Sequence, residues 1–449
     1  MSTLSERDIA HIFEALRKGL VPERGLEALA VGAESERLEL RRQLELVEGG
    51  EGSIKFLRGG YGCGKTFISR LALEDAQRAG FATSSIVVSE SDLRLHRFDE
   101  VYRKILMELR TSSYPRGALG AIIDRWIARQ RAELIAIDEG GAHIEEALER
   151  RIFDELWAMR GKRAPEEFIR VVERAIELKL RGERREADAL IGWLSGGGKL
   201  PASIKRAEGL KDAISSREAL DFLRGLLEIV KAAGYAGLVI VIDEAETFLR
   251  MRSDARHQSL NAIRQLADAA GSYPGLLIIV TGTPEFFDTR YGVAGLAPLH
   301  DRVRFIKRGR FTSLRQAQLE LRPLDRERLL ALALRLRALY LAGSTGLKRA
   351  RVKEKISEAF IERLIDEAME GLKGDMGVIP RQLLRELITQ LDLADEYKDY
   401  DPSAECGFGP EGARPNKDER DDQARAPNGI SRRRNHKKPD PLAPYEEIW

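Results

Sequence analysis

One short glycine-rich stretch decides which folds are open to this chain of 449 residues. It fits the pattern G-x-x-x-x-G-K-[ST] and consists of Gly59, Gly60, Tyr61, Gly62, Cys63, Gly64, Lys65 and Thr66. An apolar run at residues 54–57 precedes it and reads as a strand, and a helical pattern follows from Phe67. Strand, loop and helix in this order are the context in which the pattern forms a phosphate-binding loop, or P-loop. The sequence therefore predicts an α/β fold built around a nucleotide-binding loop.

The residues of this loop have separate expected roles. Its glycines let consecutive backbone N–H groups turn inward around a phosphate, and the helix that starts near Phe67 adds the partial positive charge of its N-terminus. Lys65 is expected to reach the β- and γ-phosphates of ATP, and Thr66 is expected to offer its hydroxyl to Mg²⁺. We expect the nucleotide to contact the whole stretch 59–67. The plainer alternative is a glycine turn that happens to precede Lys-Thr.

A second motif lies far downstream, where residues 238–242 form an unbroken apolar run that ends in Asp243 and Glu244. Such a run is typical of a strand buried on both faces of a parallel sheet. At its carboxyl end, Asp243 is expected to lie beside Thr66 and to help hold Mg²⁺. Glu244 is then placed to act as the general base on the attacking water. A strand that simply ends in a polar turn is the alternative.

A weaker sequence of the same kind, residues 134–139, ends in Asp138 and Glu139. Its apolar part is short and contains an alanine, and the residues before it have a helical pattern. We therefore interpret this stretch as the polar end of a helix and not as the source of the magnesium carboxylate.

Residues 276–281 form a further apolar run, which we expect to be another central strand. Thr281 and Thr283 at its end are both candidates for a hydroxyl that hydrogen-bonds the attacking water or the γ-phosphate. The spacing does not choose between them. The alternative for either residue is that it only caps the loop.

Two arginines are candidates for contacts with the phosphates. Arg302, with Arg304 close by, is expected to reach the nucleotide of a neighbouring subunit as an arginine finger, which stabilises charge on the transferring phosphoryl group. Chance placement is the rival explanation, because the chain contains 74 Lys and Arg residues. Arg381 follows Pro380 at the start of a predicted helix. A cation gains nothing from a helix N-terminus, so we expect Arg381 to lie over the nucleotide cleft. The alternative is a solvated surface charge.

Composition limits the partners and the setting. Charged residues make up 33 % of the chain and the net charge is +2, so any DNA contact has to come from a local patch. The two cysteines, Cys63 and Cys406, argue against a disulfide framework or a zinc site. The first eight residues are polar, so we expect no signal peptide, and no apolar stretch approaches the ~20 residues of a membrane span. We expect a cytoplasmic protein that makes no membrane contact.

The periodicity predicts four regions. They are N-terminal helices (1–50), a nucleotide-binding core (51–310) with a helical insertion at about 110–215, a C-terminal helical lid (311–397) and a disordered basic tail (398–449). Arg and Glu residues at helical spacing in the insertion are expected to be solvated helix faces, the alternative being an arm that binds DNA or a partner. The basic run at 432–438 is expected to keep the tail in solution, the alternative being contact with phosphate backbones.

The order of these motifs resembles the AAA+ superfamily, in its origin-initiator-like branch. Within that branch the chain is similar to the BrxD-like ATP-binding proteins of BREX phage-defence systems, over about residues 10–395. The stretches that carry this closer resemblance are VPERGL (21–26), RGGYGCGKTF (58–67), GFAT (80–83), SESD (89–92) and LHR (95–97). Cys63 departs from the family pattern, in which a small residue such as Ala or Ser is usual. We expect this cysteine to permit nucleotide binding and to make the site sensitive to thiol reagents.

The resemblance implies an ATPase that uses ATP and Mg²⁺ and acts with other defence proteins, including a helicase partner, on double-stranded DNA. It also implies a homo-oligomer, because an arginine finger of this type works between subunits. The alternative is a nucleotide-dependent switch or scaffold with little turnover, against which Glu244 argues. A phosphoryl transferase is a third hypothesis, but the sequence contains no visible acceptor site.

Overall fold

The computed structural model describes residues 4–89, 94–137, 143–161, 163–197, 200–211, 213–343, 346–371 and 379–405. Several residues singled out from the sequence lie outside these ranges. They are Asp138, Glu139, Cys406, most of the stretch 89–92 and the tail from residue 406 onward.

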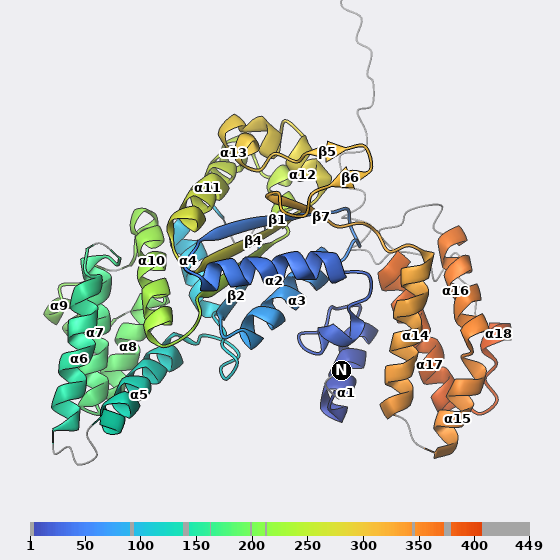
Figure 1. Cartoon of the computed structure of the whole chain (residues 1–449), viewed down its shortest axis with the longest axis horizontal. Helices are drawn as coiled ribbons and strands as arrows, with labels where there is room; N and C mark the ends of the chain where they lie inside the picture. Colours follow the sequence, from blue (N-terminus) through green and yellow to red (C-terminus); the bar gives the residue numbers. More distant parts are fainter. Residues whose placement is uncertain are drawn as a thin grey trace, which may run out of the picture. The chain divides into compact units, whose positions relative to one another are not determined.

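A five-stranded, all-parallel sheet forms the centre of the fold (Figure 1). Its strand order is β2 (Ala82–Val87), β3 (Leu238–Asp243), β4 (Leu276–Gly282), β1 (Ser53–Arg58) and β7 (Gln318–Glu320). Every residue of β3 and β4 is buried, as expected for parallel strands covered on both faces. The sheet makes this a mixed α/β protein, and it extends past residue 310, where we had placed the end of the nucleotide-binding core.

Successive side chains of the central strands enter two different hydrophobic cores. Val239 and Val241 join α2 (Glu34–Glu48) and α3 (Lys65–Arg78) on one face. Ile240 and Ile242 join the other core, with α4 (Phe98–Met107), α10 (Ser216–Ala232) and α11 (Ser253–Ser272). This alternation follows from the two-residue repeat of a strand, and it explains why β3 is apolar at every position before Asp243.

The chain between β2 and β3 is helical. Besides α4 and α10 it contains α5 (Leu119–Ile137), α6 (Ile144–Met159), α7 (Glu166–Leu180), α8 (Arg184–Leu194) and α9 (Ala202–Ala207). Phe222 of α10 makes edge-to-face contacts with Tyr102, Phe168 and Trp193, which join α4, α7 and α8 into one core. The apolar part of the stretch 134–139 lies in α5, which is helical as the sequence indicated.

The C-terminal helices are α14 (Arg326–Gly343), α15 (Gly346–Lys355), α16 (Glu358–Gly371), α17 (Ile379–Glu396) and α18 (Pro402–Glu405). They pack with α1 (Glu6–Arg17), where Phe13 meets Tyr340 edge to face and Arg17 pairs with Asp392 at 2.8 Å. Within the first 50 residues, α1 packs with the C-terminal helices and α2 packs on the sheet.

The remaining elements are the 3₁₀ turns η1 (Leu26–Leu29), η2 (Ala245–Arg250) and η3 (Val293–Gly295), the short helices α12 (Pro284–Asp288) and α13 (Ala297–Arg302), and the hairpin β5–β6 (Lys307–Arg308 and Phe311–Thr312). None of the helices in the described ranges is long and apolar enough to cross a membrane.

Four details differ from the sequence prediction. The sequence pattern predicts a second strand at residues 85–89, whereas β2 begins at Ala82, because the Ser84 hydroxyl donates to the Ile105 carbonyl at 2.9 Å and can be buried. The periodicity predicts one helix at about 352–372, whereas this part of the chain contains the two helices α15 and α16. The hairpin β5–β6 and the edge strand β7 were not predicted, since they are only two or three residues long. Residues 398–405 were expected in the disordered tail, yet α18 lies there and Lys355 donates to the Tyr400 carbonyl at 2.5 Å.

A buried ion pair joins α2 to the P-loop strand. Lys55 of β1 lies 2.8 Å from Glu39 of α2, and both side chains are almost fully buried. Lys55 also donates to the carbonyls of Leu314 and Gln316, at 3.2 and 2.8 Å. Burial raises the pKa of Glu39, but hydrogen bonds from Arg42, Lys55 and Gln43 outweigh it and lower this pKa to about 2. Glu39 is therefore charged at neutral pH.

We predict that Lys55→Met lowers the free energy of unfolding by about 3 kcal/mol, because it leaves the Glu39 carboxylate buried without its ammonium partner. The double variant Glu39→Leu/Lys55→Met should recover most of this loss, since it removes both charges. Urea denaturation measures both values, with Glu45→Gln on the exposed side of α2 as the control. A single variant as stable as the control would contradict the prediction.

Candidate functional site

The glycine-rich loop connects the carboxyl end of β1 to the first turn of α3. Gly62 and Gly64 have φ values of +73° and +83°, a left-handed conformation that favours glycine. A Cβ on Gly59 would lie 3.1 Å from the Leu321 carbonyl oxygen, so this position is tight as well. The loop therefore needs its glycines for its shape. The helix α3 begins where the loop ends. The N–H groups of its first turn have no partner within the helix and are available to a phosphate.

Lys65, the first residue of α3, folds back onto the loop. Its Nζ donates to the carbonyls of Gly59 and Gly60 at 2.9 and 3.2 Å, and it lies 5.3 Å from the centre of the Tyr61 ring. The side chain is largely buried. An ammonium group in this position is already at the mouth of the loop, where a phosphate would be bound.

Thr66, Asp243 and Thr281 form one hydrogen-bonded group. The Thr66 hydroxyl donates to Asp243 Oδ2 at 3.0 Å, and the Thr281 hydroxyl donates to Asp243 Oδ1. Asp243 is buried, and its carboxylate lies between the start of α3 and the end of β4. Thr283, the other threonine candidate, is buried at the N-cap position of α12. Of the two threonines that spacing could not separate, Thr281 is the one whose hydroxyl contacts Asp243.

Glu244 has a left-handed backbone, with φ +62° and ψ +41°. It is the one non-glycine residue with positive φ in the described part of the chain. Its N–H donates to Thr281 Oγ1 at 3.0 Å and to Asp243 Oδ1 at 3.2 Å, which holds the backbone in this conformation. Strained backbone of this kind costs about 1–3 kcal/mol and gathers at functional sites. Here it turns the Glu244 side chain out of the strand to an exposed position.

A third carboxylate, Glu246 of η2, was missed by the sequence analysis. Its Oε1 lies 3.5 Å from Lys65 Nζ, and its side chain is about nine-tenths buried. Burial raises the pKa of Glu246, the charge of Lys65 opposes the rise, and the nearby Asp243 adds to it. Oε2 is buried without a hydrogen-bond partner among the described residues. Its position three residues after Asp243 was the one feature of the sequence that could have identified Glu246 as a residue of this site.

The two arginine candidates lie elsewhere. Arg302, the last residue of α13, pairs with Asp268 of α11 at 2.8 Å. Arg381, in the first turn of α17, is exposed. It lies next to Gly19, since its Cδ would be 3.9 Å from a Cβ added to that glycine. Arg302 is therefore paired with α11, and Arg381 lies near the turn after α1.

Comparison with known protein families gives one match to this chain. The family model described as "BREX system ATP-binding protein BrxC/D" matches residues 4–409. This chain belongs to the BrxC/BrxD family. A comparison with curated proteins finds no match. The match covers the sheet, the P-loop and the C-terminal helices, and it confirms the resemblance to BREX ATP-binding proteins that the sequence indicated.

The residues of this BrxC/BrxD family member fit both ATP and Mg²⁺. Lys65 and the α3 N-terminus supply the positive charge that phosphates require. Thr66 and Asp243 present hard oxygen atoms 3.0 Å apart, the ligand type that Mg²⁺ prefers. The described residues contain no cluster of three or more His, Cys, Asp or Glu side chains that could hold a metal alone. Mg²⁺ usually takes one or two protein ligands and completes its shell with phosphate and water.

Cys63 lies within the same loop and is partly buried. Burial raises the pKa of its thiol, and the charge of Lys65 opposes the rise. A raised pKa leaves the thiol protonated at neutral pH, and a protonated thiol is a poor nucleophile. The expected sensitivity to thiol reagents is thus reduced in this state.

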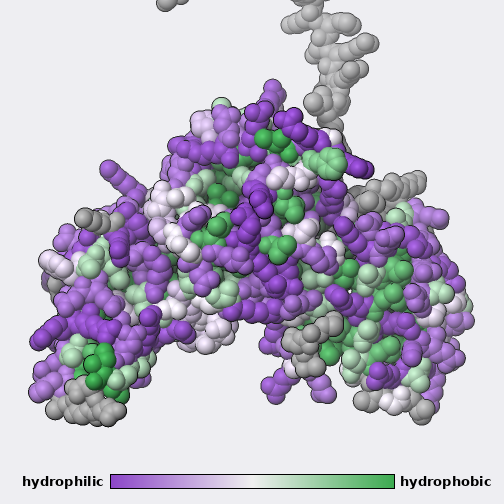
Figure 2. Space-filling view, in the orientation of Figure 1, coloured by the Kyte–Doolittle hydropathy of each residue, from purple (hydrophilic) through white to green (hydrophobic). Residues whose placement is uncertain are grey.

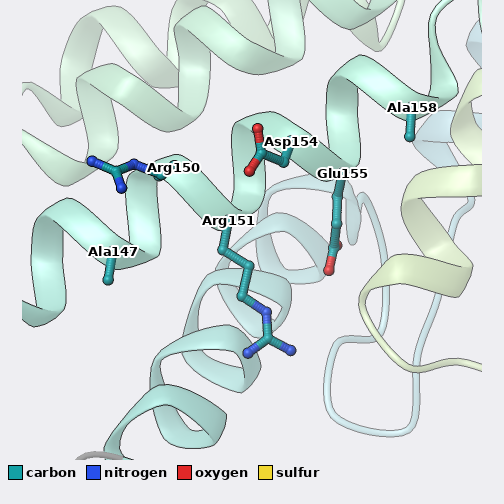
Figure 3. Close-up of a pocket in the computed structure, with 6 residues that line it drawn as sticks. All are labelled: Ala147, Arg150, Arg151, Asp154, Glu155 and Ala158. Carbon is teal, nitrogen blue, oxygen red and sulfur yellow. The ribbon is translucent and has the colours of Figure 1, made fainter.

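A separate open hollow of about 430 Å³ lies on α6 (Figure 3). Figure 3 shows Arg151 and Glu155 extending to the same side of this helix. Glu155 accepts hydrogen bonds from Trp126 at 3.1 Å and Gln130 at 2.8 Å, and Arg151 pairs with Glu133. These charges are used in fastening α6 to α5, so we assign no chemistry to this hollow.

We predict that Glu246→Gln tightens ATP binding by roughly tenfold, because it removes a buried negative charge that competes with the phosphates for Lys65. Titration with a fluorescent ATP analogue measures the affinity. Glu246→Asp, which keeps the charge, is the control and should stay closer to wild type. Weaker binding by the Gln variant would show that Glu246 helps to hold the nucleotide instead.

Proposed function

We propose that this BrxC/BrxD protein is a Mg²⁺-dependent ATPase of the AAA+ type that serves BREX phage defence. The observation that carries the proposal is the meeting of Lys65, Thr66 and Asp243 beside the strained Glu244, all at the carboxyl edge of one parallel sheet. Ligands of open parallel α/β sheets bind at this edge. The family description supports ATP binding, and the site chemistry supports hydrolysis in addition.

In the proposed reaction each residue has one task. Lys65 leaves the carbonyls of Gly59 and Gly60 and contacts the β- and γ-phosphates. Thr66 and Asp243 hold Mg²⁺, which when bound neutralises charge developing on the phosphates. Glu244 accepts a proton from the attacking water, and Thr281 keeps the Asp243 carboxylate and the Glu244 N–H in place.

The regions predicted from the sequence belong to this proposal. We assign the sheet, with the helices inserted at about 110–215, to the nucleotide-binding core, and α14–α17 to the lid. Arg302 is proposed to act on the nucleotide of the next subunit in a homo-oligomer, and for that it has to leave Asp268. Arg381 is proposed to contact the nucleotide when the lid closes. The protein is proposed to act in the cytoplasm on double-stranded DNA, with a helicase or other BREX proteins as partners.

The alternative is a nucleotide-dependent switch or scaffold with little turnover. A switch has no need of a general base. The left-handed backbone of Glu244 therefore favours hydrolysis, since it places a carboxylate outside the strand at a cost in stability.

We predict that Glu244→Gln lowers ATP turnover at least a hundredfold, the size expected for loss of a general base, while ATP stays bound. Steady-state hydrolysis with and without double-stranded DNA, together with nucleotide retention on a desalting column, tests this. Asp254→Asn, an exposed change in the first turn of α11, serves as the control. Equal turnover by wild type and the Gln variant would remove Glu244 from the mechanism. Tight ATP binding without turnover by wild type would favour the switch.

We predict that Arg302→Ala lowers turnover on the order of a thousandfold, as for other arginine fingers. Mixing it with the inactive variant Lys65→Ala should restore part of the turnover, because each supplies what the other lacks across a subunit interface. Asp268→Ala is the matched control, since it breaks the same ion pair and leaves Arg302 intact. A mixture as inactive as its components would argue against a finger acting between subunits.

A further inference from the structure

An exposed basic hairpin follows α13. We use this name for residues 304–315, which comprise β5, β6 and their flanks. The segment has no acidic residue and five basic ones: Arg304, Lys307, Arg308, Arg310 and Arg315. All five are exposed. In a protein whose net charge is only +2, this is a strong local concentration of positive charge.

Most of this charge is not neutralised by the surrounding chain. Lys307 pairs with Glu320 at 3.6 Å. Within the described ranges no ion pair involves Arg308, Arg310 or Arg315. Guanidinium groups left free in this way can form bidentate contacts with phosphates.

An aromatic ring lies among these charges. Phe311 is 69 % exposed, which is costly for a large apolar side chain in water. The strand register pairs it with Arg308, so both side chains lie on the same face of the hairpin. The Arg310 guanidinium lies 5.1 Å from the centre of the Phe311 ring. In Figure 2 the surface around the hairpin, which Figure 1 labels β5 and β6, is mainly hydrophilic, with apolar residues among the polar ones.

The base of the hairpin is fixed to the P-loop strand. Gln316 Oε1 accepts the Ile306 N–H at 2.9 Å, which closes the hairpin. Lys55 of β1 holds the outgoing strand through the Leu314 carbonyl, and the Arg58 guanidinium lies 4.3 Å from the centre of the Phe305 ring. The hairpin is thus presented on a rigid support at the strand that leads into the nucleotide site.

We propose that the basic hairpin binds a DNA strand, with Arg308 and Arg310 on the phosphates and Phe311 stacked on an unpaired base. This inference rests on the proposed action on DNA and specifies its surface and the form of DNA bound. Positive charge along a backbone path, combined with an exposed aromatic ring, is how proteins hold single strands. An acidic protein would also match the arginines, but every base has a flat face on which a ring such as Phe311 can stack, next to a phosphate for the arginines. The observations therefore favour nucleic acid.

The test measures the affinity of the full chain for fluorescein-labelled DNA of one sequence, offered as a single strand and as a duplex. Fluorescence anisotropy gives the dissociation constants over a range of salt concentrations. Arg308→Glu/Arg310→Glu should weaken single-strand binding at least tenfold and reduce the salt slope by about 1.4, the value for two lost phosphate contacts. Arg184→Glu/Arg185→Glu changes the net charge equally at exposed positions on α8 and is the matched control. Equal affinities for the two double variants would overturn the proposal.

Phe311→Ala tests the stacking. It should weaken single-strand binding roughly tenfold and leave duplex binding nearly unchanged, while Phe311→Trp should retain the wild-type affinity. Equal losses on single strand and duplex would overturn the stacked base, and binding of only acidic polypeptides by the hairpin would overturn the DNA assignment. Turnover without DNA should be unchanged in all these variants. A wild type that binds DNA but hydrolyses no ATP would reject the proposed ATPase and leave the hairpin assignment intact.

Discussion

The candidate site depends on parallel pairing that brings the carboxyl ends of β1, β4 and β3 to one level. Leu57 pairs with Thr281, and Ile242 pairs with Val280, so all three strands end within a residue of each other. Because β4 lies between β1 and β3, its threonine is beside Asp243, and the helix that follows the P-loop begins near the same carboxylate. A shift of one residue in this register would turn the central side chains to the opposite faces of the sheet.

Much of this arrangement could be predicted from the sequence because the strands concerned are long and apolar. The runs ending at Asp243 and Thr281 have no plausible place outside a buried sheet, and the P-loop pattern fixes the elements before and after it. The predicted start of β2 was too late because polar residues such as Thr83 and Ser84 are unusual in a buried strand, although hydrogen bonds allow both to be buried. The strand β7 has three residues and no periodicity to detect.

Contacts between residues far apart in the chain could not be predicted from the sequence, for a different reason. Lys65 meets Glu246 only because η2 turns back toward the loop, and nothing in the spacing of the two residues encodes that turn. The same holds for Arg302, whose pairing with Asp268 depends on how α13 packs on α11. The sequence could identify which functional side chains lie at the ends of strands and helices. The partners of those side chains are determined by tertiary packing, which the sequence pattern does not reveal.

The order of the strands has a consequence for synthesis of the chain. Among the described residues, the P-loop strand β1 pairs with β4 and β7, which come more than 200 residues later. Both of its edges therefore stay open while the helices between β2 and β3 are being made. At ribosomal rates, the interval from the end of β1 to the start of β4 lasts roughly 10–45 s. A strand with open edges is prone to pair with other chains. The edges of β1 are therefore open to aggregation during synthesis, and the polar residues Ser53 and Lys55 in this strand should reduce that risk.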